Sequence, residues 1–199
     1  MEIAPVTLRG RWLTLEPLAE RHAPDLFEVM RDEEVCRYLS WAPPEKLEET
    51  LTLVREAREL MARRHSIVFA QVWNETGRCV GSTRLLDVRP ADRHVEIGST
   101  FLARPLWRTP ANTESKYLVL SHCFEQLGCV RVALKTDARN VRSQEAIARL
   151  GASREGVLRK HMNVRGFQRD TVYYSLLDTE WPEAKRRLAE RLYGSTRES

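Results

Sequence analysis

The stretch WRTPANTESK, residues 107–116, has the composition of a helix amino terminus that could hold an anion. A cation, Arg108, and a proline, Pro110, lie just before Asn112, a residue type that caps helices well. The free N–H groups and the dipole at such a terminus attract phosphate. Phosphate-binding loops of this kind are usually rich in glycine, and this stretch contains none. Two interpretations stay open: an anion site built without glycine, or a plain strand-to-helix turn.

The residue types and their spacing give little support for a metal site, a reactive cysteine pair, a membrane span or nucleic-acid binding. The 5 histidines show no pair at metal-ligand spacing, so we expect no metal. The 4 cysteines form no C-x-x-C pair, which together with the lack of a signal peptide predicts reduced thiols and a cytoplasmic location. No apolar run reaches the roughly 20 residues of a membrane span, so we expect no membrane partner. The net charge of +4 would favour an anionic cofactor but is too small to indicate nucleic acid.

Hydrophobic periodicity divides the chain into strands and helices. The predicted strands are 11–18, 66–73, 79–86, 94–102, 130–136, 153–160 and 170–177. The predicted helices begin near residues 23, 46, 112, 141 and 182. This order predicts an α/β (α+β) fold with one domain over residues 1–199. We expect a mixed, mostly antiparallel sheet of six to seven strands with about five helices, and a C-terminal helix and tail over about 182–199.

Several phrases in this order resemble the GNAT superfamily of acyl-CoA-dependent N-acyltransferases. The phrases are VEIGSTFL, WRTPANTESKYLVL, LGCVRVALKTDARNVRSQEAIARLGASREGVLR and RDTVYYSLLDTEWP. The likeness runs from about Leu8 to Trp181 and is most specific from Val130 to Arg159. It is closest to the branch that includes enzymes acetylating the N-termini of ribosomal proteins. The resemblance implies a GNAT-like sheet that splays between its fourth and fifth strands.

The resemblance also implies where acetyl-CoA, the expected cosubstrate, would bind. Its pantetheine arm would lie in the splay, its amides pairing with the backbone of the fourth strand. The loop after that strand would wrap the pyrophosphate at the amino end of the next helix. The implied cofactor-binding residues are Thr100, Phe101, Leu102, Arg108, Thr109, Pro110, Ala111, Asn112, Thr113, Asn140 and Ser143.

The loop departs from the family pattern, which reads Arg or Gln, Gly, any residue, Gly, any residue, Gly or Ala. Residues 107–112 fill every glycine position with something larger. Pro110 also removes a backbone donor, at a cost on the order of 1–2 kcal/mol. Arg108 adds a cation that could offset this loss, and Asn112 would cap the helix. We therefore expect CoA binding that is weakened or repositioned but not abolished.

The catalytic candidates follow from the same resemblance. Acyl transfer needs a positioned thioester, an uncharged amine, a donor for the oxyanion and a proton for the thiolate. Glu96 is the candidate base, acting through a water; alternatively, it is a strand carboxylate paired with an arginine. Many family members carry an acid tyrosine where this chain has Ile147, so Ser143 is the substitute candidate, or else a capping or surface hydroxyl. Asn140 either contacts cofactor or acceptor, or caps its helix, and backbone N–H groups near residues 100–102 would meet the oxyanion.

The basic run 153–170 has two interpretations. Arg159, Lys160 or Arg165 could rim the acceptor groove or meet the 3′-phosphate of CoA. Alternatively, the run is a solvated hairpin with scattered ion pairs.

The acceptor is expected to be an α-amine. A lysine side chain with a pKa of about 10.4 is almost wholly charged at pH 7, whereas an α-amine near 7.7–8.0 is partly neutral. A site without a strong base therefore suits a protein N-terminus or a small α-amine. Cys123 and Cys129 lack a neighbouring histidine base, which favours direct transfer in a ternary complex over an acyl-cysteine. The alternative is a non-catalytic acyl-CoA- or peptide-binding protein on a degenerate fold. The sequence leaves open whether the protein forms a homodimer.

Overall fold

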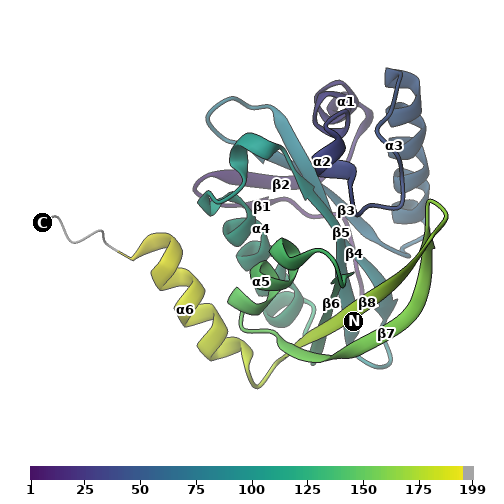
Figure 1. Cartoon of the computed structure of the whole chain (residues 1–199). Coiled ribbons are helices and arrows are strands. Elements are labelled where there is room, and N and C mark those ends of the chain that lie inside the picture. Colours follow the sequence, from purple (N-terminus) through teal and green to yellow (C-terminus); the bar gives the residue numbers. More distant parts are fainter. Residues whose placement is uncertain (195–199) are drawn as a thin grey trace, which may run out of the picture.

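Eight strands form one mixed sheet in the computed structural model, which describes residues 1–194 (Figure 1). The strands are β1 (Leu8–Arg9), β2 (Leu13–Pro17), β3 (Ile67–Trp73), β4 (Cys79–Arg89), β5 (His94–Leu102), β6 (Arg131–Asp137), β7 (Ser153–Val164) and β8 (Phe167–Leu177). Their order across the sheet is β1-β2-β3-β4-β5-β6-β8-β7. Only β5 and β6 pair in parallel; every other neighbouring pair is antiparallel.

Helices lie on both faces of the sheet. They are α1 (Ala23–Met30), α2 (Glu33–Cys36), α3 (Leu47–Ala62), α4 (Pro110–Ser121), α5 (Val141–Arg149) and α6 (Trp181–Tyr193). One face carries α1 to α3 and the other carries α4 to α6, as Figure 1 shows. Within residues 1–194, no helix is long and apolar enough to cross a membrane.

The predicted α/β fold and its long elements are confirmed, with more strands and helices than the sequence indicated. Both β1, with 2 residues, and α2, with 4 residues, are too short to show a hydrophobic period. Strand β7 extends to Val164 and strand β8 begins at Phe167, so the hairpin is longer than expected. Of the expected C-terminal helix and tail, residues 195–199 lie outside the described part.

The expected splay of the sheet is confirmed between β5 and β6, which are the fourth and fifth strands of the prediction. Their parallel register ends at Ile97 and Leu134, although β5 continues to Leu102. Just beyond this point Ser99 has a φ of 44°, and the register with β4 shifts nearby. The two strands therefore diverge at a bulge in β5.

Buried apolar side chains hold α4 on one face of this diverging pair. Val95 and Ile97 of β5 pack in one cluster with Val119 and Leu120 of α4. A second apolar cluster lies under α1 and α3 and includes Val68 of β3. Because side chains alternate along a strand, successive residues of β5 and β6 face opposite sides of the sheet.

A buried carboxylate fixes α4 to the first two strands. Glu114 accepts hydrogen bonds from the backbone N–H groups of Arg11, Trp12 and Leu13, at 2.6, 2.8 and 2.8 Å. The hydroxyl of Tyr193 in α6 donates a fourth bond, at 2.9 Å. A Cβ atom on Gly10 would lie 2.4 Å from the Glu114 carboxyl carbon, so a larger residue there would displace this hydrogen-bonded carboxylate. Glu114 thus anchors the helix whose amino terminus opened the sequence analysis.

Candidate active site

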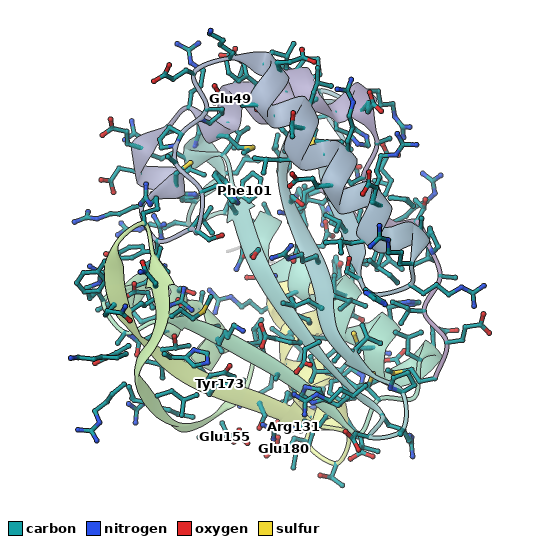
Figure 2. All side chains as sticks on the ribbon, turned by 90° about the vertical axis from the view of Figure 1, so that its right-hand side faces the viewer. Glu49, Phe101, Arg131, Glu155, Tyr173 and Glu180 are labelled. Carbon is teal, nitrogen blue, oxygen red and sulfur yellow. The ribbon has the colours of Figure 1, made fainter. Side chains whose placement is uncertain are left out.

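A cavity of about 800 Å³ opens where β5 and β6 diverge. The amino-terminal turns of α4 and α5 line one side of it, which we call the helix half. The other side, which we call the hairpin half, is lined from β4, β5 and β6, from the β7–β8 hairpin and from the segment after α2. Figure 2 views the molecule from the hairpin side, with Tyr173 of β8 and Phe101 of β5 labelled.

The loop 107–113 forms the mouth of the helix half, and α4 begins earlier than expected. Thr109 is the N-cap, because its hydroxyl accepts from the Ala111 N–H at 3.3 Å and donates to the Leu106 carbonyl at 2.7 Å. The expectation that Asn112 caps this helix is therefore wrong. Pro110 takes the first helical position, where its fixed φ fits and its missing N–H is one the helix does not use. The donor that proline removes is thus less important than we expected.

Arg108 takes the backbone conformation that a glycine would provide. Its φ is 64°, in the left-handed region that residues with a Cβ atom rarely adopt. The chain turns here between the short helical turn Arg104–Leu106 and α4. The glycine-free loop therefore keeps a turn with positive φ and gains an exposed guanidinium.

A second arginine, which the sequence analysis missed, lies at the same mouth. The guanidinium carbon of Arg142 in α5 lies 3.4 Å from the ring centroid of Trp107. The Trp107 indole in turn donates to the Leu102 carbonyl at 2.8 Å. Burial lowers the pKa of Arg142, and the nearby Arg108 lowers it further. Two cations thus converge on the amino end of α4 from segments that are distant in the sequence.

The start of α5 places two predicted residues in the cavity wall. Asn140 caps the helix, because its side chain accepts from the Ser143 N–H at 3.1 Å. Both residues line the helix half of the cavity, as does Ile147 at the position of the family's tyrosine. The capping interpretation of Asn140 is confirmed, while the catalytic role of Ser143 stays a prediction.

The end of β5 is less open than the resemblance implied. The Phe101 carbonyl accepts from the side-chain amide of Gln71 at 2.9 Å, and the Leu102 carbonyl accepts from Trp107. Thr100 lies at the start of this segment, where β5 has already left β6. Of the three residues predicted to hold pantetheine, only Thr100 has a carbonyl with no side-chain donor among residues 1–194.

Lys116 is a further residue that the sequence analysis missed, although it ends the stretch quoted first. Its ammonium nitrogen lies 2.5 Å from the Thr100 hydroxyl and 3.0 Å from the Thr83 hydroxyl. The side chain is buried, and no carboxylate within residues 1–194 comes within salt-bridge distance. Burial lowers its pKa to about 7. Lys116 can therefore lose its proton near neutral pH.

Glu96 lies in the hairpin half, on the face of β5 opposite to α4. Its side chain is 4% exposed, and its Oε1 lies 3.1 Å from the ammonium nitrogen of Lys135 in β6. Burial raises its pKa, although Lys135 and Arg84 oppose the shift. Of the two interpretations of Glu96, the ion pair is present in the structure. Its partner is Lys135, which the sequence analysis missed, and not an arginine. The raised pKa is what a general base needs.

Two arginines complete the wall around Glu96. Arg84 of β4 donates to the Ser99 hydroxyl at 2.8 Å. Arg169 of β8 is 8% exposed and donates to the Thr171 hydroxyl at 3.1 Å. Burial lowers the pKa of both guanidinium groups. Tyr173, labelled in Figure 2, lies on the same face, with its ring centroid 5.7 Å from the Lys135 nitrogen.

Of the basic run 153–170, Arg169 lines the cavity, but the three cations that the sequence analysis named do not. Arg159, Lys160 and Arg165 are not among the lining residues. Arg165 instead donates to the Arg37 carbonyl at 2.9 Å, which ties the hairpin tip to the segment after α2.

Neither cysteine in question reaches the cavity. Cys123 and Cys129 are buried in the core around α4, and burial raises the pKa of the Cys123 thiol. Within residues 1–194, no three His, Cys, Asp or Glu side chains gather in a way that could hold a metal ion.

Comparisons with known proteins agree with this architecture. The chain is similar to a GCN5-related N-acetyltransferase from Brucella melitensis, with 30% identity, a TM-score of 0.90, and coverage of 98% of this chain and 88% of that one. It is 25% identical to the uncharacterized N-acetyltransferase YoaA of Bacillus subtilis, over 83% of this chain and 93% of YoaA. It is also 31% identical to YdaF of Bacillus subtilis, provisionally named a ribosomal N-acetyltransferase, over 55% of this chain and 59% of YdaF.

A family model adds the decisive match. Residues 12–153, which include β2 to α5 and so most of the cavity wall, match the acetyltransferase (GNAT) domain. The splayed strands, the helix amino termini and this match lead to one conclusion: the chain belongs to the GNAT acetyltransferases.

Proposed function

We propose that this protein transfers the acetyl group of acetyl-CoA to an α-amine, by direct transfer within a ternary complex. The observation that carries the proposal is Glu96. It is a buried carboxylate with a raised pKa, and it lies at the point where β5 and β6 diverge. A carboxylate placed there can accept the proton of an amine that reaches the cavity from the hairpin half.

The helix half fits a CoA pyrophosphate. The first turn of α4 presents backbone N–H groups that have no partner inside the helix. Arg108 and Arg142 lie at the same mouth, and an arginine contacts phosphate through two parallel hydrogen bonds. Thr109, Asn112 and Thr113 would surround the phosphates, and acetyl-CoA would supply the thioester-activated acetyl group.

Residues from both halves of the cavity would move the protons. Glu96 takes the amine proton, directly or through a water, and Lys135 stabilises the carboxylate between turnovers. Ser143, at the start of α5, would give a proton to the leaving thiolate. Backbone N–H groups near Thr100 would stabilise the oxyanion. Such a set suits an α-amine, which is already partly neutral at pH 7.

The provisional name of YdaF and the ribosomal branch of the resemblance favour a protein N-terminus as the acceptor. Cytoplasmic proteins would be the natural source of such N-termini. A small α-amine uses the same chemistry and is the second acceptor class to test.

One matched peptide pair tests the proposal. Both peptides contain one internal lysine; one has a free α-amine and the other has a formyl-blocked N-terminus. We expect acetyl-CoA-dependent acetylation of the first peptide at its α-amine and little reaction with the second, measured by mass spectrometry and thiol release. Acetylation on the lysine of both peptides would refute the α-amine. Binding of acetyl-CoA without turnover of any amine would support the non-catalytic alternative.

A further inference from the structure

The hairpin half contains more positive than negative charge. Three cations line it, namely Arg84, Lys135 and Arg169, and within residues 1–194 Glu96 is the one carboxylate that pairs with any of them. Asp137 also lines the cavity, but its carboxylate is held by Arg139, with an Nη2 to Oδ2 distance of 2.7 Å. The wall around the proposed base therefore has an excess of positive charge.

Arg169 is the clearest case of a buried cation without a salt-bridge partner in the described part of the chain, although Asp137 and Glu96 lie near enough to oppose the lowering of its pKa. Its side chain is nine-tenths buried, yet no carboxylate of residues 1–194 lies within 4.0 Å of it. Its contacts are a threonine hydroxyl and the Met162 sulfur, which lies 3.3 Å from Nη2. An arginine cannot escape the cost of burial by losing its proton, so a buried guanidinium normally pairs with an anion.

Arg84, on the opposite wall of the cavity, is a second guanidinium without a salt-bridge partner within residues 1–194. One of its nitrogens contacts Ser99, while its Nε is buried and has no hydrogen-bond partner within residues 1–194. Arg84 and Arg169 come from β4 and β8, so they flank Glu96 and Lys135 from both sides along the sheet. Each still has donors that can point into the cavity.

We infer that the amine acceptor carries a carboxylate a few bonds from its reacting amine, which binds Arg169 while the amine meets Glu96. This rests on the proposed function, because it assigns the amine to Glu96. The carboxylate would supply the missing counter-ion in a bidentate contact. Two sources have this chemistry: the α-carboxylate of a free amino acid, and an acidic side chain at the second position of a peptide.

Matched acceptors separate these sources in the wild-type protein. We would compare the peptides Ser-Glu-Ala-amide and Ser-Gln-Ala-amide, and the free amino acid serine with serine amide. An acidic side chain as the source predicts a kcat/KM at least about 10-fold higher for the Glu peptide than for the Gln peptide. A free amino acid as the source predicts the same preference for serine over serine amide. Equal rates within both pairs would overturn the inference and leave the proposed function intact.

The variant Arg169→Gln tests whether Arg169 causes the preference for an acceptor with a carboxylate. It should raise the KM of the carboxylate acceptor about 10-fold, with little effect on its carboxamide partner or on the KM of acetyl-CoA. Arg159→Gln is the matched control, because Arg159 lies on the same hairpin, is exposed and does not line the cavity. Arg169→Lys, which keeps the charge, should restore part of the preference. An unchanged preference in a folded Arg169→Gln protein would contradict the assignment.

A binding experiment keeps the inference separate from catalysis. The N-acetylated products of the Glu and Gln peptides are titrated calorimetrically into the protein with CoA present. Tighter binding of the Glu product supports the anion site even if no turnover is found, in which case only the proposed function has failed. Equal binding of the two products excludes the peptide source, and equal binding of N-acetylserine and N-acetylserine amide as well contradicts the anion site.

Discussion

The two halves of the cavity handle buried positive charge in different ways. In the helix half the buried cation is Lys116, which hydrogen-bonds two threonine hydroxyls and has a pKa lowered to about 7. In the hairpin half it is Arg169, which stays protonated at any physiological pH. A lysine can relieve the cost of burial by releasing its proton, but an arginine needs an anion. The helix half is therefore stable without an anion next to Lys116, whereas the hairpin half is built to receive one.

The halves also differ in how the chain assembles them. Most of the helix half comes from two short contiguous segments, the first turns of α4 and α5. The anion contacts proposed for it are backbone groups and helix dipoles together with Arg108 and Arg142. The hairpin half draws single side chains from strands β4, β5, β6 and β8. Single substitutions in the helix half should each weaken acetyl-CoA binding only slightly, because many groups contact the same pyrophosphate. Single substitutions in the hairpin half should have large effects on activity, because each side chain there has a role that no other group shares.

Glu96→Gln should therefore have the largest effect. The substitution keeps the shape and removes the only proposed base, so we expect kcat to fall by about 10²- to 10³-fold, with little change in the KM of acetyl-CoA. Steady-state rates and a circular-dichroism melt would check this. A folded variant with normal kcat would mean that Glu96 is only the partner of Lys135.

The pH profile gives the same residue a second, independent test. Because burial raises the pKa of Glu96, the acid limb of kcat/KM should lie above pH 4.5, the ordinary value for the group. Lys135 lowers the Glu96 pKa, so Lys135→Met should move the limb to higher pH. Movement to lower pH would contradict this electrostatic account.

Lys116→Met should have the next largest effect, on stability. The folded-state pKa of about 7 lies below the ordinary 10.5, so the neutral form is favoured in the folded state. The penalty is full below pH 7 and fades as pH rises toward 10.5. Wild-type stability should therefore gain up to about 1.4 kcal/mol per pH unit above pH 7 from this group, and the variant should lose that gain. Urea unfolding at pH 7, 8 and 9 measures it; equal slopes in both proteins would exclude a buried, titrating Lys116.

The sequence predicted the helix half better than the hairpin half, for a physical reason. The strand-to-helix turn at 107–113 and the alternative that Asn140 caps α5 follow from local patterns that neighbouring residues share. The splay was implied by the family resemblance, and anion binding at the turn stays a prediction. Lys135 carries no such local signal, because a polar residue in an alternating strand usually faces solvent. Arg169 belongs to the basic run 153–170, but nothing in that run distinguishes it from its exposed neighbours. Only the registers of β5 with β6 and of β6 with β8 bring Lys135 and Arg169 to Glu96.

The smallest effects are expected at Arg108, where backbone and side chain act in opposite directions. Its φ of 64° is strained for a residue with a Cβ atom, so Arg108→Gly should relieve strain and stabilise the fold by up to about 1 kcal/mol. Arg108→Ala keeps the strain and removes the same cation. Both variants should bind acetyl-CoA several-fold more weakly, because an arginine–phosphate contact is lost, while their melting temperatures should differ in favour of glycine. Calorimetric titration with acetyl-CoA and thermal melts of both variants give the two quantities separately. If acetyl-CoA binds both variants as tightly as wild type, then Arg142 and the α4 amino terminus hold the pyrophosphate without Arg108, and the arginine fills the glycine position without serving the anion.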